Sequence, residues 1–149
     1  MSAGEYCNRE VIVVSKSEPL SEAISLMRSH HVGDVIVVET TAAGAIPVGI
    51  LTDRDIVLEI LAEDVDPNAV SISDVMSYEL VTVSADTKLI DTIKLMRDKG
   101  VRRIPVVNQQ GVLEGLLSVD DLLELLAEQL TDIVSLIRKE QVREGKVRK

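Results

Sequence analysis

The heptapeptide Gly49-Ile50-Leu51-Thr52-Asp53-Arg54-Asp55 returns 66 residues later as Gly115-Leu116-Leu117-Ser118-Val119-Asp120-Asp121. Upstream of it, a shift of 69 residues lays residues 6–38 over residues 75–107 with 11 identities, among them Leu-Met-Arg at 26–28 and 95–97. The change of shift is a three-residue difference in one connecting loop. Because internal repetition defines the structural unit of a fold, we expect two similar units that pack together and form a cleft with two related sites.

The composition predicts one compact domain with an aliphatic core. The chain has 149 residues, 46% of them hydrophobic, but no Phe or Trp, so Val, Ile, Leu, Met and Ala must fill its interior. Charges interrupt every apolar run before the roughly 18 residues that a membrane span needs. No signal-peptide pattern opens the chain, and the single cysteine, Cys7, excludes an internal disulfide. We therefore expect a cytoplasmic protein that does not associate with a membrane.

The net charge of −9 is unevenly distributed along the chain. Residues 138–149 carry about +4, which leaves about −13 on the rest. Such an acidic body repels phosphate backbones, so we expect no nucleic-acid partner. The basic residues suit the C-terminal end of a helix, where cations interact favourably with the helix dipole.

The pattern of apolar residues predicts the same order of elements in each half. In the first half we expect a strand at 11–14, a helix that Ser17 caps, strands at 35–38 and 48–51 around a loop at 40–45, and a helix from after Thr52 to about 63. In the second half we expect a strand at 81–83, a helix at 89–99, strands at 104–107 and 112–117 around a hairpin at 108–111, and a last helix. The strands at 35–38 and 48–51 are uniformly apolar, so helices should cover their sheet.

These elements give a mixed α/β (α+β) fold of two β-α-β-β-α repeats with pseudo-two-fold symmetry. We expect repeat 1 at 5–66, repeat 2 at 67–127 and a helical extension with a basic tail at 128–149, the two repeats forming one module. The apolar pattern of the last helix continues from 119 to about 141, far beyond its counterpart in the first half. Nothing inside one chain can cover all of that stripe, so we expect a contact with a second subunit in a homodimer.

The repeated motif has a structural and a functional interpretation. The spacing of Thr52 and Asp55, and of Ser118 and Asp121, is that of a helix capping box. The same geometry leaves a hydroxyl and backbone amides at the end of a strand, where an anion can bind. The Asp can accept hydrogen bonds from a vicinal diol, as acidic residues do for the ribose in dinucleotide sites. Capping and binding are compatible, and both remain open.

The tandem arrangement resembles a pair of cystathionine-β-synthase (CBS) domains. The resemblance covers about residues 5–127 and rests on the doubled Gly…Thr/Ser-x-x-Asp motif and on the apolar-x-x-apolar-Pro-Val-Val segment at 101–107. It implies two repeats packed through their sheets, and an adenosine-containing ligand in the cleft between them. The usual role of such a pair is to regulate an attached or partner protein.

The resemblance implies two ligand sites, each with residues from both repeats. The first would combine Ile50, Thr52, Arg54 and Asp55 with Val101, Arg102, Arg103 and Pro105. The second would combine Leu116, Ser118 and Asp121 with Val32, Gly33, Asp34 and Ile36. Arg102 and Arg103 also have a purely structural interpretation, as partners of surface carboxylates.

The two predicted sites differ in charge. Arg103 lies where a phosphate would bind in the first site, whereas Asp34 has the matching position in the second. At about 4 Å and an effective dielectric constant near 20, a unit-charge pair is worth about 4 kcal/mol before solvent screening. We therefore expect the first site to bind a phosphorylated adenosine, and the second, weaker site to be empty or to take a ligand without phosphate.

The sequence thus predicts a non-catalytic sensor of AMP, ADP or ATP that signals to an unidentified partner protein by a conformational change. No arrangement of His, Lys or Ser beside the carboxylates suggests acid–base catalysis, and we expect no catalytic cofactor and no metal site. One alternative is a module for protein interaction or oligomerisation whose ligand sites are degenerate. Another is a sensor of S-adenosylmethionine or NAD.

Overall fold

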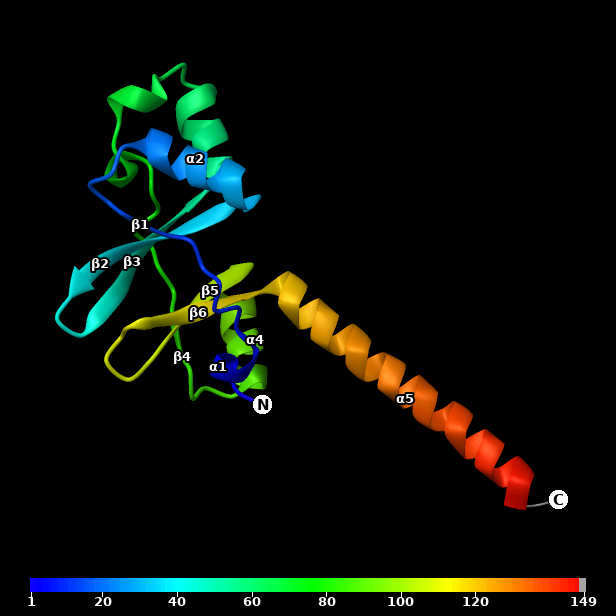
Figure 1. The fold of residues 1–149 in the computed structure, drawn as a ribbon. Coiled ribbons are helices and arrows are strands. Elements are labelled where there is room, and N and C mark those ends of the chain that lie inside the picture. The colour runs from blue at the N-terminus through cyan, green and yellow to red at the C-terminus, as the bar shows by residue number, and fades with distance from the viewer. Residues whose placement is uncertain (148–149) are drawn as a thin grey trace. The chain divides into compact units, whose positions relative to one another are not determined.

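The computed structural model describes residues 1–147 and divides the chain into two compact units, Met1–Leu117 and Ser118–Lys149. The chain forms two three-stranded sheets, with the strand orders β1-β2-β3 and β4-β5-β6 (Figure 1). The order of the strands is the same in both sheets when each strand is matched to its equivalent in the other repeat. The predicted mixed α/β fold of two related repeats is therefore confirmed.

The first sheet comprises β1 (Val13–Ser15), β2 (Asp34–Thr41) and β3 (Gly44–Thr52). β1 runs parallel to β2, and β2 runs antiparallel to β3. Helix α2 (Leu20–His30) connects β1 to β2 and packs on the sheet through its buried face. Residues from α2, the sheet and the segment after it share one core: Leu20, Ala23, Met27, Val35, Val37, Leu51 and Ile60.

The second sheet comprises β4 (Val83–Ser84), β5 (Arg103–Val107) and β6 (Leu113–Ser118). β4 runs parallel to β5, and β6 lies beside β5. Helix α4 (Leu89–Lys99) connects β4 to β5 and has the predicted bounds. It ends at Gly100, whose left-handed backbone (φ 65°) lets its amide reach back to the last turn.

The strands differ in extent from their predictions. β1 and β4 begin two residues later than expected, and each is shorter than its partner. The loop expected at 40–45 is mostly strand, because the β2–β3 ladder continues to the pair Thr41–Gly44. Gly44 allows this tight hairpin with φ 136°, a conformation that other residues rarely adopt.

The helices of the first repeat also depart from the sequence-based expectation. Ser17 does not cap α2: the N-cap is Pro19, and no side chain supplies a capping hydrogen bond there. After β3, the chain forms the short helix α3 (Asp53–Ile56), which continues as the π-helical turn η1 (Val57–Leu61). The expected helix is therefore present but ends at 61 and changes its hydrogen-bond pattern midway, which sequence periodicity does not reveal.

The segment before each first strand crosses to the other repeat. Asn8 and Leu116 exchange two backbone hydrogen bonds, both 2.9 Å, and Ser77 and Ile50 exchange two of 2.9 and 3.2 Å. Asn8 is equivalent to Ser77 by the 69-residue shift, and Leu116 to Ile50 by the 66-residue shift. Two symmetry-related bridges thus join the repeats.

Short helices accompany these crossing segments. α1 (Ala3–Tyr6) lies at the second repeat, where the amide of Gly4 donates to the carbonyl of Ala85 at 3.0 Å. η2 (Pro67–Ala69) and η3 (Ile72–Asp74) precede the bridge of the first repeat. Ile72 and Met76 belong to the core of that repeat, although the sequence assigns them to the second. The predicted boundary between residues 66 and 67 stays a prediction. It divides the two copies of the repeat in the sequence, whereas the side chains of Ile72 and Met76 pack on the other side of that boundary, in the core of the first repeat.

Glycines stand at both crossings because the crossing backbone leaves no room for a side chain. A Cβ on Gly115 would lie 2.6 Å from the carbonyl oxygen of Asn8, and one on Gly49 would lie 2.7 Å from that of Ser77. We expect Gly115→Ala to lower the free energy of unfolding by about 1–3 kcal/mol, as overpacking does. Urea unfolding measures the change.

Gly145 provides the matched control for this substitution. It lies in the last helix, where a Cβ on this residue would have no neighbouring atom within 4 Å, so alanine meets no obstacle there. We expect Gly145→Ala to stabilise that helix by up to about 1 kcal/mol. Equal unfolding free energies for the two variants would show that the backbone crossing at Gly115 is not close-packed.

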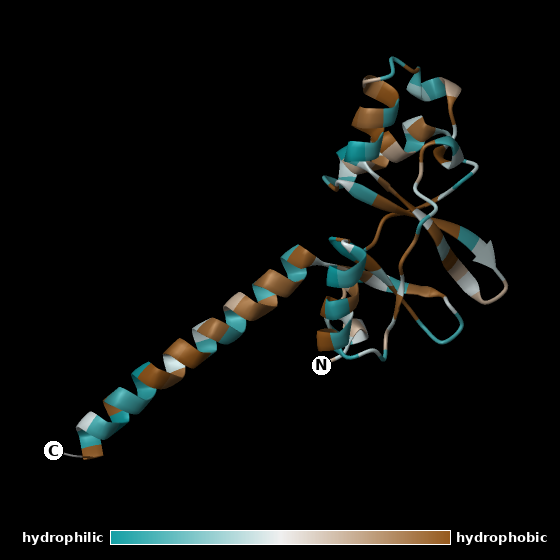
Figure 2. Ribbon diagram, turned by 180° about the vertical axis from the view of Figure 1, so that it is seen from behind, coloured by the Kyte–Doolittle hydropathy of each residue, from teal (hydrophilic) through white to brown (hydrophobic). Residues whose placement is uncertain are grey.

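The second unit is formed by the helix α5 (Val119–Val147), which has 29 residues. The predicted long last helix is confirmed, and it continues to the last described residue, six residues beyond the expected end near 141. Brown apolar and teal polar residues alternate along it (Figure 2). Its exposed large apolar residues are Leu123, Leu126, Leu130, Ile133, Val134, Leu136, Ile137, Val142 and Val147.

Within residues 1–147, no helix is both long enough and apolar enough to span a bilayer.

Candidate functional site

The first copy of the repeated motif forms a capping box where β3 ends and α3 begins. Thr52 is the N-cap residue, and its extended backbone (φ −113°, ψ 161°) turns the chain from strand to helix. Its Oγ1 accepts a hydrogen bond from the amide of Asp55 at 3.2 Å, and Asp55 Oδ2 accepts one from the amide of Thr52 at 3.0 Å. These reciprocal bonds fix the half-buried carboxylate at the end of the strand.

The second copy forms the same box at the start of α5. Asp121 Oδ2 accepts a hydrogen bond from the amide of Ser118 at 3.1 Å, and Ser118 Oγ accepts one from the amide of Asp121 at 3.2 Å. The hydroxyl of Ser118 also donates to the Asp121 carboxylate at 2.9 Å. Both copies therefore cap a helix, as the structural interpretation of the motif predicts.

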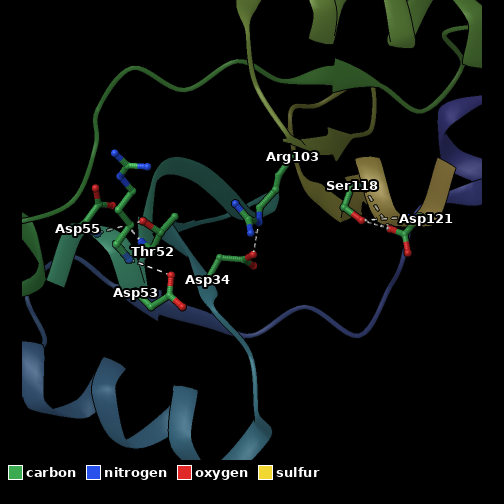
Figure 3. A network of polar contacts seen from close by, with 8 residues as sticks. Asp34, Thr52, Asp53, Asp55, Arg103, Ser118 and Asp121 are labelled. Carbon is green, nitrogen blue, oxygen red and sulfur yellow. Dashed lines mark hydrogen bonds and ion pairs between the residues drawn. The ribbon is translucent and has the colours of Figure 1, made fainter. Parts of the chain in front are cut away.

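An ion pair between the repeats joins two residues that the sequence assigned to different sites. Arg103 Nε, at the start of β5, contacts Asp34 Oδ2, at the start of β2 (Figure 3). The Asp34 side chain is only 18% exposed and that of Arg103 35%, so solvent screens the pair incompletely. Positions 34 and 103 are equivalent by the repeat. The pair therefore links the same point of both repeats, across the pseudo-two-fold axis.

Asp34 also connects Arg103 to the first capping box. In the β2–β3 ladder, Asp34 is the direct partner of Thr52. Next to it, the carbonyl of Gly33 accepts a hydrogen bond from the amide of Asp53 at 2.8 Å. Arg103 from the second repeat thus contacts the side chain of Asp34, and Thr52 from the first repeat is the backbone partner of the same residue. The structure brings these two predicted site residues to the same neighbourhood.

The other residues predicted for the first site differ in exposure. Arg54 and Arg102 are exposed, whereas Ile50 and Val101 are half-buried. Pro105 is fully buried, so its side chain offers no surface to a ligand in this structure. Arg54 and Arg102 are therefore accessible to solvent, whereas the side chain of Pro105 is not.

The residues predicted for the second site are distributed over both compact units. Val32 and Asp34 are half-buried in the first unit, and Ile36 is fully buried there. Leu116 is half-buried in the same unit, and its backbone forms the bridge with Asn8 described above. Ser118 and Asp121 belong to the second unit. The grouping of these residues into one site stays a prediction.

Asp53 lies within the first capping-box segment and was not among the residues that the sequence predicted for a site. Its Oδ1 accepts a hydrogen bond from the amide of Arg54 at 2.8 Å. Its Oδ2 would lie 3.0 Å from a Cβ on Gly33, so the carboxylate fits against a glycine. The equivalent residue in the second copy is Val119. The difference between Asp53 and Val119 is the feature of the sequence by which this residue could have been selected.

Two surface hollows occupy equivalent places in the repeats, away from the predicted sites. The hollow in the first repeat has a volume of about 410 Å³ and is lined by residues 13–18 and 38–40. The one in the second repeat, of about 240 Å³, is lined by Ala85, Asp86, Asn108, Gln109, Gln110 and Glu114. No predicted site residue lines either hollow. Over the part of the chain that is described, no three His, Cys, Asp or Glu side chains gather as metal ligands do.

A model of the CBS domain matches residues 3–62 and 72–128 of the chain. An uncharacterized protein of Methanopyrus kandleri is 36% identical over 125 residues, which are 84% of this chain and 62% of that protein. The CBS domain-containing protein YhcV of Bacillus subtilis is 38% identical over 121 residues, 81% of this chain and 82% of that protein. The chain thus spans about three fifths of the first relative and most of the second.

Solved structures of CBS proteins are similar to this fold. A hexameric CBS-CP12 protein from bloom-forming cyanobacteria aligns with a TM-score of 0.72 and 28% identity, over 83% of this chain and 66% of that one. Hypoxic Response Protein I, solved with two coordinated zinc ions, gives 0.71 and 28%, over 83% and 98%. The cytosolic domain of the Mg²⁺ channel MgtE in complex with ATP gives 0.69 and 26%, over 83% and 48%. With both repeats matched and the paired sheets observed, the chain belongs to the CBS domain family, as a tandem pair of CBS repeats.

Proposed function

We propose that this CBS pair is a regulatory module that binds an adenine nucleotide, AMP, ADP or ATP, at Thr52, Asp55 and Arg103. The observation that carries the proposal is the position of Asp34, which is the ladder partner of Thr52 and the ion-pair partner of Arg103. In the proposed site, repeat 1 would supply the group for the sugar hydroxyls and repeat 2 the group for the phosphate, with Asp34 as the residue that connects them. The related MgtE domain, whose structure contains ATP, supports this choice of ligand.

Each residue has a chemical role in the proposed complex. The Asp55 carboxylate accepts hydrogen bonds from the ribose diol, a role for which acidic residues are well suited. The Arg103 guanidinium binds the phosphate, since its planar donors match phosphate oxygens. The capping box holds Asp55 in place before the ligand arrives, so that less side-chain freedom is lost on binding.

Asp34 gives the module a way to respond to the ligand. Asp34 belongs to repeat 1 and Arg103 to repeat 2, so their ion pair is a bond between the repeats. A phosphate that takes Arg103 away from Asp34 replaces this bond by a bond through the ligand. A ligand changes a conformational equilibrium only if it binds the two states unequally. Competition for Arg103 supplies that inequality, and the changed surface would then signal to the regulated partner protein.

The proposal also covers the oligomeric state, the cellular location and the partner of the protein. CBS domains are generally regulatory rather than catalytic, and we propose no reaction for this chain. We propose a cytoplasmic homodimer that controls a partner protein not yet identified. Arg54 and Arg102, both exposed, are available to longer polyphosphates.

One observation favours a second candidate function. Arg103 already has a carboxylate partner within the protein, so the anion position is satisfied without a ligand. The chain would then be a ligand-independent module for protein interaction, with α5 as its contact surface. The two candidates differ in whether a small molecule stabilises the fold.

Thermal unfolding in the presence of candidate ligands separates the two functions. We expect AMP, ADP or ATP to raise the melting temperature, because a ligand at 100 times its Kd stabilises the folded state by about 2.7 kcal/mol. S-adenosylmethionine and NAD, tested in parallel, measure selectivity. No shift with any of these compounds at millimolar concentration would reject nucleotide sensing and favour the interaction module.

A further inference from the structure

The ion pair between Arg103 and Asp34 joins one residue of each predicted ligand site. The family resemblance assigns Arg103 to the first site and Asp34 to the second. The two side chains point toward one another from different repeats (Figure 3). Within residues 1–147, the structure gives neither of them another ion-pair partner. The charged group of each site is therefore held by the charged group of the other.

The Asp34 carboxylate depends on Arg103 for its positive partner. Its side chain is the less exposed of the two, so water replaces a lost cation incompletely. The neighbouring charge is also negative, because the Asp53 carboxylate lies against Gly33, the residue before Asp34. When a phosphate takes Arg103 away, Asp34 becomes a position that favours another positive charge.

We propose that Asp34 binds the positive charge of a second ligand, and that this ligand and the nucleotide strengthen one another's binding. The proposal rests on the proposed function, because the nucleotide phosphate has to take Arg103 from Asp34. Either ligand alone has to break the ion pair, whereas the two together break it only once. The coupling is therefore positive, and by thermodynamic linkage each ligand raises the affinity for the other by the same factor.

The chemical class of the second ligand follows from the repeat and from the charge of Asp34. The two sites are related by the repeat, so the second ligand should also contain adenosine. The carboxylate of Asp34 repels phosphate and attracts a cation. A cationic adenosine derivative without phosphate meets both conditions. S-adenosylmethionine, which carries a positive sulfonium group, is the probe.

Isothermal titration calorimetry of the full-length protein measures the coupling. Saturating S-adenosylmethionine should raise the affinity for ATP by up to about 5-fold, the contribution of a partly exposed ion pair. S-adenosylhomocysteine has a neutral thioether in place of the sulfonium and should have a smaller effect. An ATP affinity that S-adenosylmethionine leaves unchanged or lowers would overturn the proposal. Absence of ATP binding in either condition would instead reject the proposed function.

Arg103→Ala tests the second ligand without any nucleotide. The substitution removes the cation from Asp34, so S-adenosylmethionine should bind the variant up to about 5-fold more tightly than the native protein. Asp34→Asn should weaken the binding of S-adenosylmethionine and make the ATP affinity independent of it. Arg97→Ala, which breaks the exposed pair with Asp98, is the matched control and should change neither affinity.

The outcome of the Arg103→Ala titration decides between binding at Asp34 and binding elsewhere. Equal affinities of the native protein and Arg103→Ala for S-adenosylmethionine, or no binding to either, would show that Asp34 does not bind its charge. Circular dichroism of each variant verifies that it is folded.

Discussion

Arg103→Ala is expected to weaken ATP binding about 10- to 100-fold, because a hydrogen bond to a charged group contributes about 1.5–3 kcal/mol. The lost group is the guanidinium that we assign to the phosphate, so adenosine, which has no phosphate, should bind the variant as it binds the native protein. Isothermal titration calorimetry with both ligands measures the difference. The effect should therefore appear in the ratio of the ATP and adenosine affinities.

Asp34→Asn should change ATP affinity in the opposite direction. The substitution removes the charge that competes with phosphate for Arg103, and it keeps the size of the side chain. A pair of partly exposed charges contributes about 0.2–1 kcal/mol, so we expect ATP to bind up to about 5-fold more tightly. If Asp34→Asn weakened ATP binding, Asp34 would hold Arg103 in position for the ligand rather than compete with it.

Arg97→Ala is the matched control for the loss of a positive charge. Arg97 lies on α4 of the same repeat and pairs with its neighbour Asp98 at 3.0 Å on the exposed surface. The Arg97→Ala substitution removes one positive charge, as Arg103→Ala does, but at a residue outside the proposed site. Equal losses of ATP affinity in both variants would indicate a general electrostatic effect and would remove Arg103 from the binding site.

The sequence predicted the first and last residues of a helix or strand correctly where residues of that same element determine them. α4 has its predicted bounds because its apolar stripe begins at Leu89 and because a left-handed glycine ends it at 100. The boundaries of β1 and β4 were less accurate, since a strand of two or three residues has little periodicity of its own. The π-helical turn after α3 could not be predicted, because its hydrogen bonds leave no period in the sequence.

The sequence did not predict which segments far apart along the chain contact one another. The bridge between Asn8 and Leu116 joins residues more than 100 positions apart, and no residue type in it marks the pairing. The ion pair of Arg103 with Asp34 joins opposite charges at equivalent positions of the two repeats, and this difference is visible in the sequence. Equivalent residues of two repeats can meet only near the axis that relates them, and opposite charges at such a position favour a bond between them. The repeat alignment treated the two charges as belonging to separate sites, although the fold makes them partners.

Asp55→Ala is expected to abolish most nucleotide binding, with a loss of about 100-fold or more, because the carboxylate would otherwise accept charged hydrogen bonds from the ribose. The same substitution also removes the capping box, which should lower the free energy of unfolding by about 0.5–2 kcal/mol. Binding and stability therefore have to be separated. 2′-Deoxy-ATP provides one separation: the native protein should prefer ATP to it, and Asp55→Ala should bind both with the same low affinity.

Asp121→Ala provides the other separation, because Asp121 forms a capping box of nearly the same geometry. Its Oδ2 accepts from the amide of Ser118 at 3.1 Å, against 3.0 Å for Asp55 and the amide of Thr52. Both variants should therefore lose similar stability in urea unfolding. Only Asp55→Ala should lose ATP binding, since only the site of Asp55 has Arg103 for the phosphate. If neither variant lost binding, the repeated motif would serve the helices alone. If Asp121→Ala lost it instead, the nucleotide would bind at the second site, and the charge difference between the sites would not determine which one is occupied.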